Sequence, residues 1–290
     1  METFLHQLSS GFASGAVYAS LALALVMIYR ATHLVNFAQG ELAMFATYVA
    51  WAMLHAGVPY WVAFFATLAI SFGAGMLIER TVIRPMRHAP EISVVIVLIA
   101  LLLIFNSMAG FLFGTDIQVF PSPFGTLDAW ENPFVNAHQL GMVAITLAVV
   151  SVLFAFFQFT SLGLAMRAAA VNPQSSRLVG IRVGSMLALG WGLSAAIGAI
   201  AGMMVAPVVF LEPNMMLGVQ LYAFAGALIG GIDSPLGAVL GGFLVGVLEN
   251  LVGAYLVGTE LKLTVALVLI ILVLIFRPSG MLGKTIVARV

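Results

Sequence analysis

The sequence predicts an all-α polytopic membrane protein, from its composition, its recurring apolar runs and the uneven placement of its basic residues. Of its 290 residues, 62% are hydrophobic and 8% are charged, and the mean hydropathy is +1.14. Soluble domains carry about 25% charged residues. Apolar runs near the roughly 20 residues that a helix needs to cross a bilayer recur along the whole chain. Only helices satisfy the backbone groups of such runs in lipid.

The apolar runs predict about nine transmembrane helices in a single membrane domain, 1–290. The seventh run is short, and if it is re-entrant, eight full crossings remain. Glu2 and His6 stand where a cleavable signal would carry basic residues, so we expect the first run to stay in the protein. The predicted spans are 9–29, 40–56, 61–79, 92–113, 138–159, 185–210, 219–232, 236–257 and 262–276.

Basic residues set the predicted orientation of these spans. With the N-terminus outside, only Lys262 of the 11 lysines and arginines falls in an outside segment. Cytoplasmic loops of membrane proteins carry an excess of Lys and Arg. We therefore predict an outside N-terminus and a cytoplasmic C-terminus. The residues on the inside are Arg30, Arg80, Arg84, Arg87, Arg167, Arg177, Arg182, Arg277, Lys284 and Arg289.

The longest outside segment is 114–137, which has no Lys or Arg. We expect it to form a folded cap at the external interface. Neither this segment nor any inside loop is long enough for a soluble catalytic domain of ordinary size. Energy for transport would then come from an ion gradient or from a separate subunit. The residues that suggest the cap are Pro121, Pro123, Trp130 and Pro133, and the acidic residues of the segment are Asp116, Asp128 and Glu131.

The inside segment 162–184 carries three arginines and reads as two short helical pieces. Residues 166–170 favour a helix because they are rich in alanine. Asn172 is placed as an N-cap, Pro173 occupies the first helical position, and Gly180 can end the second piece. One hypothesis is a short rigid helix that presses against another protein. The alternative is an ordinary charged connector between two spans.

Glycines recur four residues apart within the predicted spans. Small residues at that spacing let helix backbones approach closely in lipid. Tight packing within one bundle is the main interpretation, and a subunit interface is the alternative for at least one of these faces. The pairs are Gly11 and Gly15, Gly198 and Gly202, Gly226 and Gly230, Gly237 and Gly241, and Gly242 and Gly246.

Polar residues at the start of the second span are the first candidates for a translocation path. Asn36, Gln39 and Glu41 lie in the stretch LVNFAQGE. Polar groups are costly within a membrane and tend to be functional. A capping role is an alternative, because Asn36 can cap the helix and Glu41 would be favoured by the helix dipole.

Two further spans carry polar residues. Glu249 and Asn250 lie well inside the eighth span, where a carboxylate should face a partner, a water-filled cavity or an interface. Structural and functional interpretations both remain open for this pair. Asn106 in the fourth span is a weaker candidate of the same kind.

Several functional classes are disfavoured. A net charge of +0 gives no sign of nucleic-acid binding, and the absence of cysteine excludes disulfides and thiolate metal sites. The stretch 278–285, PSGMLGKT, resembles a phosphate-binding loop but has Pro278 in place of the first glycine and no preceding strand. Ser14 has no mid-span histidine to activate it as a nucleophile. We predict no cofactor, no metal site and no catalytic residue.

Four stretches of the chain carry a joint signal, and in chain order they are GAVYASLALALVMIYRATHLVNFAQGE, LGLAMRAAAVNPQSSRLVGI, GGIDSPLGAVLGGFLVGVLEN and FRPSGMLG. Together they resemble the LivH-type permease subunit of branched-chain amino acid ABC importers. The resemblance runs from about Gly11 to Gly283, nearly the whole chain. Two departures are small: Gln39 stands where many relatives have His, and Asp233 stands in a turn that is usually rich in glycine.

The resemblance implies a multi-pass protein of the bacterial inner membrane that forms half of a translocation path. Its implied partners are a second homologous permease subunit, two cytoplasmic ATPase subunits, which supply the enzymatic activity, and an extracytoplasmic solute-binding protein. It also implies that the basic inside loop is the coupling helix, with Arg167 and Arg177 as charge contacts. The implied coupling residues are Gly163, Arg167, Ala168, Asn172, Pro173, Arg177 and Gly180, and the path or gating candidates remain Asn36, Gln39, Glu41, Asn106, Glu249 and Asn250.

Two other transport functions remain as alternatives. A urea or short-chain amide permease of the same superfamily would look alike in sequence, because the binding protein supplies most of the selectivity. An ion-coupled secondary transporter would use Glu41 and Glu249 as its intramembrane carboxylates, and it would work without ATP. An intramembrane hydrolase is the alternative from the enzyme class, and it would depend on Ser14.

Overall fold

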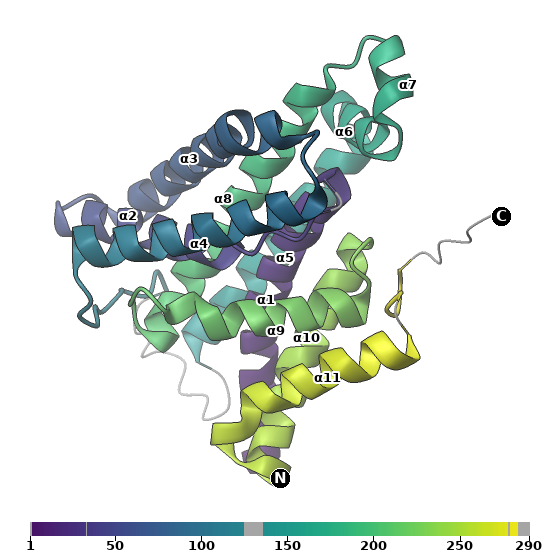
Figure 1. The fold of residues 1–290 in the computed structure, drawn as a ribbon. Helices are drawn as coiled ribbons and strands as arrows, with labels where there is room; N and C mark the ends of the chain where they lie inside the picture. The colour runs from purple at the N-terminus through teal and green to yellow at the C-terminus, as the bar shows by residue number, and fades with distance from the viewer. Residues whose placement is uncertain (1, 33, 125–135, 278, 284–290) are drawn as a thin grey trace. The chain divides into compact units, whose positions relative to one another are not determined.

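The computed structural model describes residues 2–32, 34–124, 136–277 and 279–283. The regular structure of these residues is helical, apart from one isolated antiparallel bridge between Gln118 and Leu211. Figure 1 shows the helices in chain order. The all-α prediction is therefore confirmed for the described part of the chain.

Each predicted span overlaps a helix. Among the described residues, six helical segments, 2–30, 60–86, 91–113, 137–159, 183–209 and 235–257, are long and apolar enough to cross a membrane. The helices α2, α9 and α11 are apolar but shorter, with 17, 16 and 15 residues. The nine helices are α1 (Glu2–Thr32), α2 (Gln39–His55), α3 (Tyr60–Ile78), α4 (Glu91–Phe113), α5 (Ala137–Phe159), α8 (Val183–Val209), α9 (Met215–Gly230), α10 (Pro235–Val252) and α11 (Lys262–Phe276).

Two of these helices end in irregular turns. The helix α3 continues through a π-helical turn, η1 (Glu79–Ile83), and a 3-10 turn, η2 (Arg84–Met86). The helix α10 continues through a second π-helical turn, η3 (Gly253–Val257), followed by a 3-10 turn, η4 (Thr259–Leu261). Such π-turns are rare and occur frequently at functional sites.

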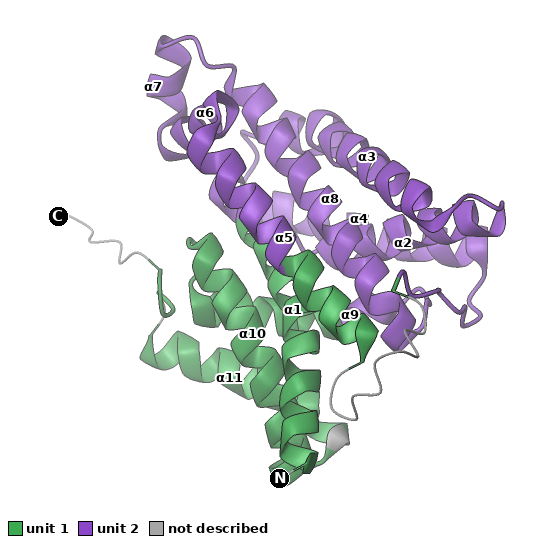
Figure 2. Cartoon of the chain, turned by 180° about the vertical axis from the view of Figure 1, so that it is seen from behind, with its two compact units in different colours: residues 1–26, 124–146, 218–290 green, residues 27–123, 147–217 purple. Residues whose placement is uncertain are grey.

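The chain divides into two compact units, which Figure 2 colours separately. Unit 1 comprises residues 1–26, 124–146 and 218–290, and unit 2 comprises residues 27–123 and 147–217. Within unit 2, α2 and α3 both pack against α8. Its hydrophobic core includes Ile28, Ile78, Ile83, Val94, Leu98 and Trp191.

The glycine pairs bring helices together inside each unit. In unit 1, a Cβ added at Gly11 would lie 2.8 Å from the Cα atom of Val247, and one at Gly15 would lie 2.8 Å from the Cα atom of Phe243. In unit 2, a Cβ at Gly202 would lie 2.6 Å from the carbonyl oxygen of Ala43. Real Cβ atoms do not approach so closely, so these positions hold helix backbones in contact. The prediction of tight packing within the chain is confirmed for these faces.

The arginine-bearing segment 162–184 contains most of two short helices, α6 (Ser161–Val171) and α7 (Pro173–Leu178). The Asn172 side chain accepts a hydrogen bond from the Ser175 backbone N–H at 3.0 Å, as an N-cap does. Pro173 occupies the first position of α7, and Gly180 follows the helix with a φ of +84°. The predicted cap, first-turn proline and terminating glycine are all confirmed.

The first of these helices starts earlier than the alanine-rich stretch 166–170. The Thr160 hydroxyl accepts from the Gly163 N–H at 3.0 Å and caps α6. Thr160 also donates to the Phe156 carbonyl oxygen at 2.6 Å. This hydroxyl therefore joins the end of α5 to the start of α6.

The predicted external cap lies partly outside the described residues. Asp128, Trp130, Glu131 and Pro133 fall in the stretch 125–135, which the structure does not describe. In the described part, Gln118 pairs with Leu211 through two backbone hydrogen bonds of 2.9 Å. Lys284, Thr285 and Arg289 also lie outside the described residues, as does Pro278.

Candidate functional site

The α6–α7 segment, residues 161–178, presents an apolar surface to solvent. Val171 is 85% exposed and Leu178 is 89% exposed, and Leu164 lies on an exposed face of α6. Arg177, near the end of α7, is also exposed. Figure 2 shows α6 and α7 at one extremity of unit 2. Large exposed apolar side chains mark a surface that contacts another protein or a membrane.

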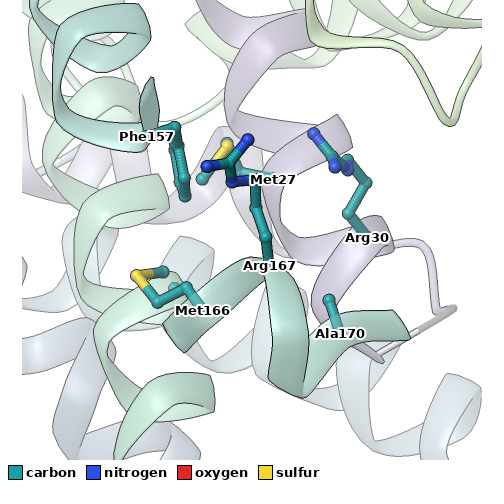
Figure 3. Close-up of a pocket in the computed structure, with 7 residues that line it drawn as sticks. Met27, Arg30, Phe157, Met166, Arg167 and Ala170 are labelled. Carbon is teal, nitrogen blue, oxygen red and sulfur yellow. The ribbon is translucent and has the colours of Figure 1, made fainter. Parts of the chain in front are cut away.

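The two arginines of this segment face different surroundings. Arg167 lines a small cavity of about 30 Å³ together with Met27, Arg30 and Phe157 (Figure 3). Its Nε atom is buried and has no hydrogen-bond partner among the described residues. Arg177 is the more exposed of the two arginines.

The remaining candidate coupling residues shape the segment. A Cβ added at Gly163 would lie 2.6 Å from the Cα atom of Phe157, so the turn from α5 to α6 requires glycine. The Ala168 carbonyl oxygen accepts from the Asn172 N–H at 3.0 Å. This bond closes the last turn of α6 directly before the cap of α7.

Asn36 and Gln39 form a buried hydrogen-bonded cluster with Ser194 of α8. The Asn36 amide donates to Gln39 Oε1 at 3.2 Å, and the Ser194 hydroxyl donates to the same oxygen at 3.1 Å. Gln39 Nε2 in turn donates to the Ser194 carbonyl oxygen at 3.0 Å. All three residues belong to unit 2 and are fully buried.

The alternative that Asn36 caps α2 is wrong. The N-cap position is Ala38, which makes no side-chain cap bond. Asn36 Oδ1 instead accepts from the Ala38 N–H at 3.1 Å, so it bonds ahead of the helix rather than within its first turn. Glu41 does lie in the first turn of α2, as the dipole interpretation required.

Glu41 and Asn106 meet in a second cluster of unit 2. Asn106 Nδ2 donates to Glu41 Oε2 at 3.3 Å, to the Pro213 carbonyl oxygen at 2.9 Å and to Asn214 Oδ1 at 3.2 Å. Glu41 is 1% exposed. Since Gln39 contacts α8 and Glu41 contacts α4, the start of α2 carries polar groups on two faces.

Glu249 and Asn250 belong to a third cluster, in unit 1. The Tyr18 hydroxyl donates to Glu249 Oε2 at 2.7 Å, and the Tyr18 ring stacks on Tyr222 with centroids 4.9 Å apart. Lys262 Nζ donates to Asn250 Oδ1 at 3.3 Å and lies 3.9 Å from Glu249 Oε1. Ionisable groups in membrane helices are expected to be paired in this way.

The sequence analysis missed Tyr18, Ser194, Lys262 and a fourth cluster around Glu79. Glu79 lies in η1 and accepts hydrogen bonds from two arginines that follow it, Arg84 and Arg87. One signal was available in the sequence, because Glu79 is the only acidic residue within the basic stretch ERTVIRPMR.

The chain matches known permeases along nearly its whole length. Residues 7–274 match the family described as "Branched-chain amino acid transport system / permease component". The chain is 30% identical to the high-affinity branched-chain amino acid transport system permease protein LivH of Escherichia coli, over 99% of this chain and 98% of that protein. It is 31% identical to the corresponding protein BraD of Pseudomonas aeruginosa, over 99% and 98%.

A solved structure supports the fold alone. The chain is similar to PsaBC from Streptococcus pneumoniae in complex with Fab, with a TM-score of 0.51, 11% sequence identity, and coverage of 94% of this chain and 93% of that chain. The full-length match to the family and the relatives at 30% identity or more lead to one conclusion. This chain belongs to the family of permease components of branched-chain amino acid transport systems.

Proposed function

We propose that this chain is a transmembrane subunit of an ATP-binding-cassette importer and forms half of the path for branched-chain amino acids. The relatives at 30% and 31% identity are both named for transport of these solutes. The proposed assembly contains a second homologous permease, two cytoplasmic ATPase subunits and an extracytoplasmic binding protein. ATP hydrolysis takes place in the ATPase subunits.

The α6–α7 segment is the observation that carries this proposal. It is a rigid pair of capped helices with exposed apolar side chains and an exposed arginine. In our topology it lies on the cytoplasmic side, where an ATPase would dock. Movement of the docked ATPases would then push on α6 and α7 and shift the helices that flank them.

The proposed topology has nine membrane segments in the bacterial inner membrane, with the N-terminus outside and the C-terminus in the cytoplasm. The helices α2, α9 and α11 are shorter than the other six. We therefore propose that they lie nearly parallel to the membrane normal or end before they reach the membrane interface. The placement of the basic residues supports the orientation.

The three buried polar clusters are the proposed elements of the translocation path or of its gates. They are the Asn36–Gln39 cluster, the Glu41–Asn106 cluster and the Glu249–Asn250 cluster. Each places amide, hydroxyl or carboxylate groups on helices that would otherwise be apolar. An amino acid crossing the membrane needs such groups in place of water.

Reconstitution tests the proposal directly. The chain is co-purified from its native membrane and identified with its companions by mass spectrometry. The complex is then placed in proteoliposomes with the binding protein, and uptake of labelled leucine is measured with and without ATP. We expect two ATPase subunits in the complex and uptake that requires ATP. Uphill uptake by the chain alone, driven by an ion gradient, would overturn the proposal in favour of a secondary transporter.

Substitutions on α7 test the docking surface. We expect Arg177→Glu to reduce both leucine uptake and recovery of the ATPase subunits in a pull-down, because it reverses the exposed charge of the segment. Arg167→Glu should have the same effect if Arg167 also reaches the ATPase. Arg80→Glu is a matched control, since Arg80 is exposed on another part of unit 2. Uptake of urea or short-chain amides in place of leucine would favour the alternative solute class.

A further inference from the structure

Glu79 is a buried carboxylate held by two arginines. The Glu79 residue is 1% exposed. Arg84 Nη2 donates to Glu79 Oε2 at 2.7 Å, and Arg87 Nη2 donates to Glu79 Oε1 at 2.9 Å. Arg84 Nε adds a third bond, to Oε2 at 3.2 Å. Both carboxylate oxygens therefore have charged donors, and the end of α3 is fixed to the loop that follows it.

Arg84 also binds a distant part of unit 2. Its Nη2 atom donates to the Gly184 carbonyl oxygen at 2.8 Å. Gly184 lies in the first turn of α8, a few residues after α7 ends at Leu178. A Cβ added at Gly184 would lie 3.4 Å from Arg84 Cζ, so the guanidinium packs directly on this turn. One side chain thus joins η1 to the start of the helix that follows α7.

Stability alone is a weak account of such a site. Burying an ion pair costs desolvation that its attraction only partly offsets, and apolar residues of similar size are often as stable. Apolar neighbours are available here, since Ile78, Ile83 and Trp191 form the core beside the cluster. The planar fork of arginine can bind a carboxylate and a carbonyl together in a fixed geometry. Fixed geometry, rather than net stability, is what this arrangement supplies.

A cavity lies between the α6–α7 segment and the cluster of Glu79, Arg84 and Arg87. It has a volume of about 510 Å³, and Glu79 and Arg87 line it on one side. Ala169, Pro173 and Arg177 of the α6–α7 segment line it as well. Packed side chains do not fill the space between α7 and η1, whereas Gly184 is held rigidly. The α6–α7 segment therefore has room to move toward or away from η1. The start of α8, which follows this segment, stays bonded to the end of α3 through Arg84 and Glu79.

We infer that Glu79 and Arg84, supported by Arg87, form a clamp that transmits movement of the α6–α7 segment to α3. The inference rests on the proposed function, in which the ATPases move this segment. Pushing on α7 displaces the start of α8, and the clamp carries that displacement to η1 and α3. Glu79 and Arg84 are positioning residues in this account, because they bind neither solute nor nucleotide.

The test uses the full complex with its ATPases and binding protein, in proteoliposomes. The variants are Arg84→Gln, Arg84→Lys and Glu79→Gln, and Arg80→Gln is the matched control because Arg80 is an exposed arginine of the same π-turn. The measured quantity is the number of leucine molecules imported for each ATP hydrolysed. We expect Arg84→Gln and Glu79→Gln to lower this ratio about fivefold or more. Arg80→Gln should leave it unchanged.

Arg84→Lys distinguishes a clamp from an ordinary ion pair. Lysine keeps the positive charge next to Glu79 but lacks the planar fork that also reaches Gly184. We expect Arg84→Lys to restore the melting temperature lost in Arg84→Gln, while the ratio of leucine to ATP stays low. If lysine restores both quantities, the site is only an ion pair and the inference is wrong.

A spectroscopic measurement covers the case in which a variant assembles poorly. Because the chain has no cysteine, Thr81→Cys in η1 and Arg182→Cys before α8 can each carry a unique spin label. With the clamp intact, the distance between the labels should stay narrowly distributed with and without bound ATP. With Arg84→Lys it should broaden or change on ATP binding.

Two failures would be distinguishable. If the unmodified complex shows no ATP-driven uptake, the proposed function is wrong. If it transports leucine and the variants keep both the normal ratio and the narrow label distance, only the clamp is wrong.

Discussion

Glu79 and Glu249 are both buried carboxylates on long helices, but their partners differ in kind. Glu79 accepts from two guanidinium groups, with distances of 2.7 and 2.9 Å. The nearest donor of Glu249 is the neutral Tyr18 hydroxyl at 2.7 Å, and the Lys262 ammonium stays 3.9 Å away. Glu41 has a neutral donor too, the Asn106 amide at 3.3 Å.

The difference separates structural ties from candidate path residues. The charge of Glu79 is compensated by two arginines in its own site, so this carboxylate holds a fixed geometry and its oxygens are already occupied as acceptors. Glu41 and Glu249 are held by neutral or distant donors, which supports the proposal that they respond to a passing ammonium group. Buried carboxylates in membrane proteins therefore need to be sorted by their partners and not by burial alone.

The largest effect should come from Glu79→Ala. The substitution leaves Arg84 and Arg87 without their shared acceptor and removes the tie between η1 and α8. Breaking one partner of a fully buried ion pair costs about 3 kcal/mol, and the cost here is smaller because the Arg84 and Arg87 side chains are 37% and 28% exposed. We expect a clear fall in the melting temperature of the purified complex, which is measured by fluorescence-detected gel filtration after heating.

Glu91→Ala is the control for this experiment. Glu91 lines the same cavity but is exposed, at the start of α4. Its loss should leave the melting temperature within the error of the measurement. Equal melting temperatures for the Glu79 and Glu91 variants would contradict the assignment of Glu79 as a structural tie.

Asn106→Ala should have the next largest effect. It removes the amide that donates to Glu41 and leaves a buried carboxylate without that donor. An unsatisfied buried polar group costs about 2 kcal/mol. We expect lower stability of the single variant, and partial recovery in Asn106→Ala combined with Glu41→Leu, because the carboxylate is then absent.

A double-mutant cycle gives the coupling between these two residues. Melting temperatures of both single variants and the double variant are compared with the unmodified protein. Strict additivity would mean that the Asn106 amide does not stabilise Glu41, and that its bonds to Pro213 and Asn214 account for its burial.

Tyr18→Phe should change transport more than stability. The variant keeps the ring that stacks on Tyr222 and removes only the hydroxyl that donates to Glu249. Because Glu249 is a proposed path residue, the loss of a bond that contributes about 1.5 kcal/mol should alter its interaction with the solute, and we expect leucine uptake to fall about tenfold. Tyr222→Phe preserves the same stacked pair and serves as the control. Normal uptake by Tyr18→Phe would remove Glu249 from the path.

The local structure of the α6–α7 segment could be predicted because its signals act within a few residues. Asn172 caps its own helix, Pro173 needs no donor there, and Gly180 takes up a positive φ. The apolar runs located the long helices for the same reason. Their ends were less predictable, and α1 extends from Glu2 to Thr32, beyond both limits of the predicted span.

The clusters were harder to predict because their partners are distant in sequence. Arg84, which binds Glu79, also binds Gly184, which lies 100 residues further along the chain. The distribution of basic residues predicts on which side of the membrane a charge lies. It does not predict what that charge binds. The alternative in which Asn36 caps α2 was wrong because Asn36 Oδ1 accepts from the Ala38 N–H, before α2 begins at Gln39, and Asn36 Nδ2 donates to the Gln39 side chain.

The smallest effect should come from Lys262→Met. The Lys262 side chain is 23% exposed, and its ammonium lies 3.9 Å from the Glu249 carboxylate. Partly exposed ion pairs at this distance contribute about 0.5 kcal/mol, and methionine keeps most of the apolar stem that packs against Gly253. We expect leucine uptake within about twofold of normal. A loss as large as that of Tyr18→Phe would show that Lys262 compensates Glu249 as fully as the arginines compensate Glu79, and the contrast between the two carboxylates would then disappear.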